Sequence, residues 1–153
     1  MKYKIITIWA ILVMMTVYAC KKEEKNEIKI SKNGEFESHN MGKNCMSCHV
    51  SGGNGEGWFK VAGTVYDSLF NQTIANGKVE LYTQANAQGD KVLTIEIDGN
   101  GNFYSTENID FKQGLYPVVT SQSGKKKFMA SSISQGACNS CHNVSQSKIW
   151  VNK

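Results

Sequence analysis

The feature that most constrains this chain is a pentapeptide that occurs twice, as Cys45–His49 (CMSCH) and Cys138–His142 (CNSCH). Both copies follow the pattern C-x-x-C-H. In this pattern two thiols bind the vinyl groups of a c-type haem, and the adjacent histidine ligates the iron. Two intervening residues let one short turn present both sulfurs to the same porphyrin edge. We therefore expect two covalently attached c-type haems. The expected attachment and proximal ligand residues are Cys45, Cys48, His49, Cys138, Cys141 and His142.

The N-terminus predicts export, which covalent haem attachment requires. Lys2 and Lys4 precede an apolar run over residues 5–19. This run is shorter than the about 20 residues of a membrane-spanning helix and is typical of a secretory signal peptide. The run ends at Ala19-Cys20 and resembles a bacterial lipobox. Residues 1–19 are thus predicted to be a signal peptide and Cys20 the lipidated first residue. The alternative is an uncleaved or differently cleaved signal with Cys20 free.

The residues that follow predict a tether. Residues 20–38 are polar and lysine-rich, so we expect a flexible charged linker. Residues 21–24 (KKEE) resemble the surface-export signal of Bacteroidetes lipoproteins, with a charged linker as the alternative interpretation. The resemblance implies a lipid anchor at the outer face of the bacterial outer membrane. With a charged linker instead, the anchored protein could face the periplasm.

The charge of the chain argues against nucleic acid as a partner. The whole-chain net charge is +4, but Lys2 and Lys4 lie in the predicted signal peptide, and the propionates of two haems would lower the charge further. All 17 basic residues are lysines, so no guanidinium is present for bidentate phosphate recognition. We therefore expect no nucleic acid binding.

The region between the two motifs predicts strands. Apolar and polar residues alternate in six segments separated by turn residues: 59–66, 78–83, 92–97, 103–105, 114–120 and 126–129. Six or seven short strands at this spacing are typical of a β-sandwich. Pro117 is expected at an edge or an irregularity because it cannot donate to a ladder. Residues 98–102 predict an inter-strand turn rather than a calcium loop, since Phe103 stands where an EF-hand needs glycine.

The order of these segments resembles a known family. Residues 61–67, 77–82, 98–104 and 114–116 resemble the carboxypeptidase-regulatory-like (prealbumin-like) sandwich, and the flanking motifs resemble those of exported bacterial dihaem cytochrome lipoproteins. The resemblance implies a mainly β fold, a seven-stranded antiparallel sandwich flanked by two short haem-binding segments. The expected divisions are residues 1–19 (signal peptide), 20–38 (linker), 39–58 (first haem-binding segment), 59–131 (sandwich) and 132–153 (second haem-binding segment).

The sixth iron ligands are constrained by the scarcity of histidine. Besides His49 and His142 the chain contains only His39, so at most one haem can have two imidazoles from this chain. Met41 and Met129 are the methionines that remain as sixth ligands for the other haem. Met129, nine residues before Cys138, is the candidate chosen, with core packing as its alternative role. Which of His39 and Met129 serves which haem stays open, because a ligand can cross to the neighbouring site.

These residues favour electron transfer by a protein that is not an enzyme, with other envelope redox proteins as partners. Three alternatives remain open. A five-coordinate iron would make the protein a gas sensor or a weak peroxidase. The sandwich could be a cell-surface binding module with structural haems. The four cysteines could form a Cys₄ zinc site. The sequence also leaves open whether the two motifs lie close together.

Overall fold

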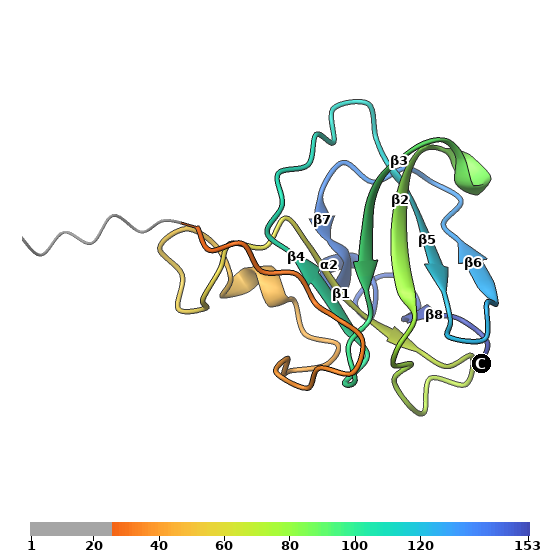
Figure 1. Ribbon diagram of the computed structural model, residues 1–153, viewed down its shortest axis with the longest axis horizontal. Helices are drawn as coiled ribbons and strands as arrows, with labels where there is room; N and C mark the ends of the chain where they lie inside the picture. Colours follow the sequence, from red (N-terminus) through yellow and green to blue (C-terminus); the bar gives the residue numbers. More distant parts are fainter. Residues whose placement is uncertain (1–25) are drawn as a thin grey trace, which may run out of the picture.

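The computed structural model describes residues 26–153. The predicted signal peptide, Cys20 and residues 21–25 lie outside the described residues. The described chain contains eight strands and very little helix (Figure 1). The elements are η1 (Cys45–Ser47), β1 (Val61–Tyr66), β2 (Lys78–Gln84), η2 (Ala85–Ala87), β3 (Gln88–Glu96), β4 (Asn102–Ser105), β5 (Tyr116–Thr120), β6 (Lys126–Phe128), β7 (Gly136–Ala137), α2 (Cys138–Cys141) and β8 (Ile149–Trp150).

The strands form two sheets. One has the order β4-β1-β7, with β8 also pairing with β1, and the other is the antiparallel sheet β3-β2-β5-β6. β-branched residues favour the extended backbone of β1 and β2, in which five of six and three of seven residues are buried. The core consists of Val61, Val65, Ile74, Val79, Leu81, Leu93, Ile95, Ile97, Phe103, Leu115, Val119 and Val151. The prediction of a mainly β, sandwich-like fold is confirmed.

The sandwich differs from the purely antiparallel arrangement that was expected. β7 and β8 both pair with β1 in parallel, Ala62 opposite Ala137 and Tyr66 opposite Trp150. Both strands belong to residues 132–153, which were assigned to a separate haem-binding segment. Val151, from the same segment, is only 1% exposed. The second C-x-x-C-H motif is therefore built into the first sheet, between two strands that share β1.

Contacts with the sandwich also begin earlier in the chain than residue 39. Ile30 forms a bridge with Ser105, and Ser31 is 1% exposed. The Ser31 hydroxyl donates to the Glu96 carbonyl oxygen at 2.6 Å, and the Ser31 N–H donates to the Tyr104 carbonyl oxygen at 3.0 Å. Part of the predicted linker thus packs against the edge of β4, because these hydrogen bonds satisfy its buried polar groups.

Two local predictions have different outcomes. The turn at residues 98–102 is present, and Asp98 Oδ1 accepts hydrogen bonds from the N–H groups of Asn100 and Asn102, both at 2.9 Å. Pro117 lies in the inner strand β5 and not at a sheet edge. It is tolerated there because the β5–β6 register starts at Val118, so the missing N–H falls where the ladder ends.

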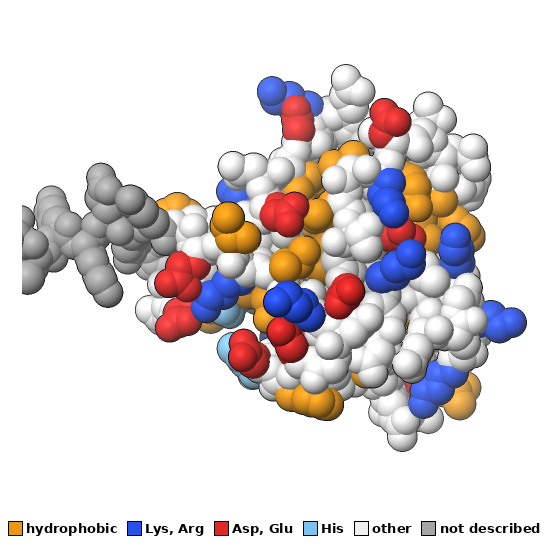
Figure 2. Space-filling view, in the orientation of Figure 1, with side chains coloured by type: hydrophobic (Ala, Val, Ile, Leu, Met, Phe, Trp, Pro, Cys, Tyr) orange, Lys and Arg blue, Asp and Glu red, His pale blue; other side chains and the backbone are white. Residues whose placement is uncertain are grey.

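Surface charge is unevenly distributed. On the face drawn in Figure 2, acidic and basic side chains alternate over the central strands, and basic side chains predominate toward the β6 edge.

No helix within residues 26–153 is long and apolar enough to cross a membrane.

Candidate functional site

Both C-x-x-C-H motifs adopt one helical turn. The first forms η1, with the Asn44 side chain accepting a hydrogen bond from the Met46 N–H at 3.2 Å, and the second forms α2. In each motif the histidine N–H donates to the carbonyl oxygen of the first cysteine, at 3.0 Å from His49 and 3.0 Å from His142. Residues three apart share one face of a helical turn, so each pair of thiols is presented on one side.

The two motif histidines are held in the same way. His49 Nδ1 lies 2.8 Å from the Glu56 carbonyl oxygen, and His142 Nδ1 lies 2.6 Å from the Ser147 carbonyl oxygen. A carbonyl oxygen can only accept, so Nδ1 carries the proton in both rings. Nε2 is then the unprotonated nitrogen with a free lone pair. When a histidine binds a metal through one ring nitrogen, the other ring nitrogen commonly donates a hydrogen bond to a backbone carbonyl oxygen, as Nδ1 does here.

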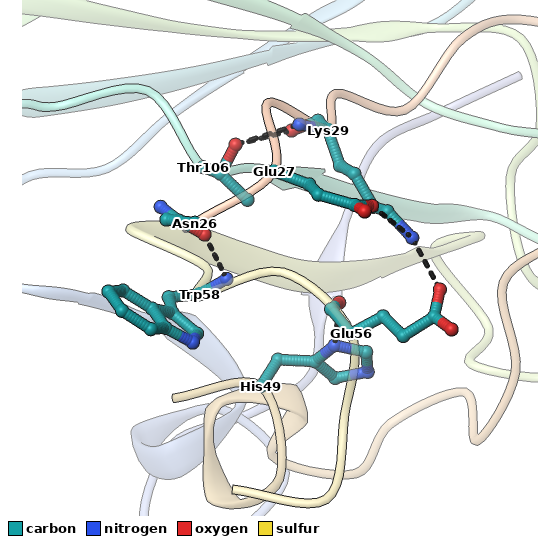
Figure 3. A network of polar contacts seen from close by, with 7 residues as sticks. All are labelled: Asn26, Glu27, Lys29, His49, Glu56, Trp58 and Thr106. Atoms are coloured by element: carbon teal, nitrogen blue, oxygen red, sulfur yellow. Dashed lines mark hydrogen bonds and ion pairs between the residues drawn. The ribbon is translucent and has the colours of Figure 1, made fainter. Parts of the chain in front are cut away.

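The loop that holds His49 is anchored to the N-terminal segment (Figure 3). The Lys29 ammonium donates to Glu56 Oε2 at 2.8 Å, and the Trp58 N–H donates to Asn26 Oδ1 at 2.6 Å. The hydrogen bond from Lys29 lowers the pKa of the Glu56 carboxyl. These contacts place the Glu56 carbonyl oxygen beside His49, which explains why the segment before residue 39 is ordered against the sandwich.

Gly55 gives His49 its space. A Cβ at residue 55 would stand 2.7 Å from both Cγ and Nδ1 of the imidazole, closer than carbon atoms approach without a shift. On its other side the ring stacks on Phe59 at 4.1 Å between centroids and 5° between planes, and Phe59 stacks on Tyr104 at 4.7 Å. His49 is thus fixed by packing as well as by its hydrogen bond.

His39 lies at the first motif. Its ring centroid is 5.9 Å from that of His49, with planes inclined by 37°. Metal–nitrogen bonds of about 2 Å place the centroids of two imidazoles on opposite sides of one metal about 6 Å apart. The spacing of the two rings therefore fits a pair that shares one iron.

A cleft of about 510 Å³ contains the first motif. It is within the size range of cofactor sites. Its lining includes Cys45, Cys48, His49 and His39, the aromatic side chains Phe59 and Tyr104, and charges of both signs from Lys29, Lys43, Glu37 and Glu56.

A second cleft of about 420 Å³ contains the second motif. It opens between the two sheets, since core side chains of both sheets line it: Val61, Val79, Leu81, Phe103 and Val119. Desolvation raises the pKa of the Cys138 thiol to about 12. Met129 also lines this cleft, and its N–H donates to the Pro117 carbonyl oxygen at 3.1 Å just beyond β6. His39 and Met129 thus lie at different motifs.

The two motifs are joined by side-chain hydrogen bonds. Asn139, a middle residue of the second motif, donates from Nδ2 to the Lys43 carbonyl oxygen at 2.9 Å and to Thr64 Oγ1 at 3.0 Å. The Thr64 N–H donates to Asn139 Oδ1 at 3.2 Å. Thr64 is fully buried and Asn139 is 4% exposed. The turns of the two motifs therefore lie side by side on β1.

The same network reaches the segment that carries His39. The Thr64 hydroxyl donates to Asn102 Oδ1 at 2.6 Å, and Asn102 Nδ2 donates to Ser38 Oγ at 2.9 Å and to the His39 carbonyl oxygen at 3.3 Å. Sequence reasoning missed Thr64, Asn102 and Asn139. Asn139 stands at a variable position of the motif, and a buried threonine in a strand has no sequence pattern of its own.

Comparisons with protein-family models, with curated proteins and with solved structures gave no match. Within residues 26–153, no three His, Cys, Asp or Glu side chains are grouped so that they alone could hold a metal ion. The four cysteines of the motifs are free. The Cys₄ zinc site considered from the sequence is therefore not formed.

Proposed function

We propose that this protein is a dihaem c-type cytochrome that transfers electrons, with one haem held by Cys45 and Cys48 and the other by Cys138 and Cys141. One observation carries the proposal. Both motif histidines bind a backbone carbonyl through Nδ1, which leaves Nε2 available as an iron ligand, and each lines a cleft large enough for a cofactor. Two C-x-x-C-H sequences that bind no cofactor would not be expected to share both the Nδ1 hydrogen bond and a cleft at the histidine.

When bound, the two haems would supply one-electron redox chemistry. The chain's own residues would set how they differ. At the first motif His39 would provide a second imidazole, and at the second Met129 would provide a thioether, which gives a higher potential. Electrons would then pass from the first site to the second. The hydrogen bond between Asn139 and Lys43 supports this role, because it keeps the two sites close together.

A second candidate function is the binding of a small neutral gas. It is favoured by the apolar second cleft, which no second histidine lines. If Met129 leaves the iron free, the site would accept carbon monoxide or a similar ligand. Within the lining of this cleft only lysines are charged, so no carboxylate is present to assist peroxide cleavage, and electron transfer is preferred over catalysis.

The proposal also includes the location of the protein, its partners and its scaffold. Lipidation at Cys20 would anchor the protein in the outer membrane, and other envelope redox proteins would be its partners. The two-sheet architecture supports the prealbumin-like sandwich as the scaffold that carries both haem sites.

The test is production of the full chain in a host with a c-type maturation system. Peroxidase-activity staining of a denaturing gel detects only covalent haem, and a haemochrome assay counts haems per chain. We expect two haems, and one haem in each of the double variants C45S/C48S and C138S/C141S. The control C20S changes the only other cysteine and keeps both haems. An unstained band from the parent chain would overturn the proposal.

A further inference from the structure

The two clefts differ in charge. The first is lined by two lysines and two glutamates, Lys29, Lys43, Glu37 and Glu56. In the second, the only charged lining residues are Lys127 and Lys148. The sequence from residue 111 to the C-terminus, which supplies most of this lining, contains six lysines and no acidic residue. The second cleft is therefore an apolar space with two positive charges.

The ammonium groups of Lys127 and Lys148 both lie over aromatic rings and have no negatively charged partner within residues 26–153. Lys127 Nζ is 3.9 Å from the Trp150 ring centroid, and Lys148 Nζ is 4.2 Å from the Tyr66 ring centroid. Neither forms an ion pair with a carboxylate of residues 26–153. An aromatic face stabilises a cation only in part. A carboxylate brought into the cleft would pair with these lysines without displacing an existing partner.

The strand register gives the distance along β1 between the second motif and the aromatic rings beneath the two lysines. Ala137, the residue before Cys138, pairs with Ala62, and Trp150, beneath Lys127, pairs with Tyr66. Four residues separate these register positions, which is about 13 Å at the rise of a strand. This length is comparable with the width of a haem. The Lys127 ammonium thus lies toward the end of the cleft away from the attachment thiols, and Lys148, which also lines the cleft, directly precedes β8.

We infer that Lys127 and Lys148 bind the two propionates of the haem attached at Cys138 and Cys141. The inference rests on the proposed function. A haem is an apolar macrocycle with its two carboxylates on the edge away from the vinyl groups. Attachment of the vinyl edge at Cys138 and Cys141 directs the propionate edge toward β6 and β8, where the lysines stand. Charge and shape of the cleft both match this orientation.

The lysines also affect the redox balance of the two sites. Positive charge close to an iron stabilises its reduced form. In the first cleft two glutamates balance the charge of the two lysines, whereas the second cleft has no glutamate. The lysines would therefore raise the potential at the second site, in the same direction as Met129. Removal of either lysine should lower one midpoint potential and leave the other unchanged.

The experiment compares Lys127→Gln and Lys148→Gln with the control Lys126→Gln in the haem-loaded full chain. Lys126 lies on the same strand, is exposed and does not line the cleft. We expect K127Q and K148Q each to shift the propionate bending band in the resonance Raman spectrum and to lower one of two midpoint potentials. K126Q should change neither, and Lys127→Arg should restore the band and potential lost in K127Q.

Each failure has its own signature. If the chain carries no covalent haem, the proposed function fails. If two haems are present and the band and both potentials of K127Q and K148Q equal those of the parent, the lysines do not bind propionates. Equal changes in K126Q would overturn the inference as well, because the effect would then be one of general surface charge. The two glutamine variants are tested separately, so misfolding of one leaves the other as the test.

Discussion

The side-chain amide of Asn139 donates to the backbone carbonyl oxygen of Lys43 at 2.9 Å. Asn139 lies inside the turn of the second motif, and Lys43 lies two residues before Cys45, where the first motif begins. A single buried side chain thus connects two segments that are 96 residues apart in sequence. The relative position of the two proposed haems depends on this contact and on its continuation through Thr64.

Asn139→Ala should destabilise the protein and loosen the two sites. The change removes both hydrogen bonds between Asn139 and Thr64 and leaves the buried Thr64 N–H without a partner, which costs about 1–3 kcal/mol. We therefore expect the free energy of unfolding to fall by about 1–3 kcal/mol in denaturant titrations. Ser140→Ala is the control, because its hydroxyl bonds only to near neighbours in the chain, the Ala137 carbonyl oxygen and Cys141 Sγ. Equal losses in N139A and S140A would contradict a linking role.

His39→Ala should open one iron of the haem-loaded protein to exogenous ligands. The centroid distance of 5.9 Å to His49 predicts that His39 completes a bis-histidine site. We expect H39A to lose part of its low-spin absorption and to bind carbon monoxide at one haem in the reduced state. Met41→Ala is the matched control, since Met41 lies two residues away and its side chain is exposed. A carbon monoxide spectrum of H39A like that of the parent would rule out His39 as a ligand.

Met129→Ala should act on the other haem. Met129 and His142 line the same cleft, which predicts a His/Met site. We expect M129A to lower the higher of the two midpoint potentials and to bind carbon monoxide, and Met129→His to lower that potential while keeping the haem low-spin. If the parent already binds carbon monoxide at one haem and M129A changes nothing, the gas-binding alternative is favoured instead.

Gly55→Ala should disturb only the first site. The added Cβ would stand 2.7 Å from the His49 ring, which is too close without displacement of the ring from its hydrogen bond with the Glu56 carbonyl oxygen. We expect weaker low-spin absorption from one haem, with the absorption of the other unchanged. Ser51→Ala, an exposed residue of the same loop, should have no effect. A normal spectrum from G55A would show that the loop adjusts.

Glu80 predicts a pH dependence of stability. Burial acts to raise the pKa of this carboxyl, but hydrogen bonds from Lys91 at 3.1 Å and Lys78 at 3.2 Å outweigh it and lower the pKa. A carboxyl with a lowered folded-state pKa adds stability above its unfolded pKa of about 4.3 and loses it as the pH falls through the folded value.

We therefore expect Glu80→Gln to cost about 1–2 kcal/mol of unfolding free energy near neutral pH, with the difference from the parent vanishing in acid. Denaturant titrations at neutral and acidic pH measure this difference. Asp90→Asn changes an exposed carboxylate of the neighbouring strand, β3, and is the control. A loss in E80Q that is the same at both pH values would show that the ion pairs do not cause it.

The strands could be predicted where their side chains alternate over several residues. β1 and β2 are six and seven residues long, so their runs of apolar and β-branched residues are visible in the sequence, although consecutive residues of both strands are buried. β7 and β8 have two residues each, which is too short for a period to be seen. They exist because β1 offers partners on its free edge. This long-range pairing, which sequence periodicity does not report, moved the second motif into the sheet.

The sequence by itself determined the two C-x-x-C-H turns and predicted the residues proposed to bind haem, because such a turn depends on contacts within about four positions of the chain. Tertiary structure alone decided how the two turns relate. It placed them together through Thr64 and Asn139, put His39 at the first and Met129 at the second, and left one cleft mixed in charge and the other cationic. These relations arise from contacts between residues far apart in sequence, which only the packing of the two sheets brings together.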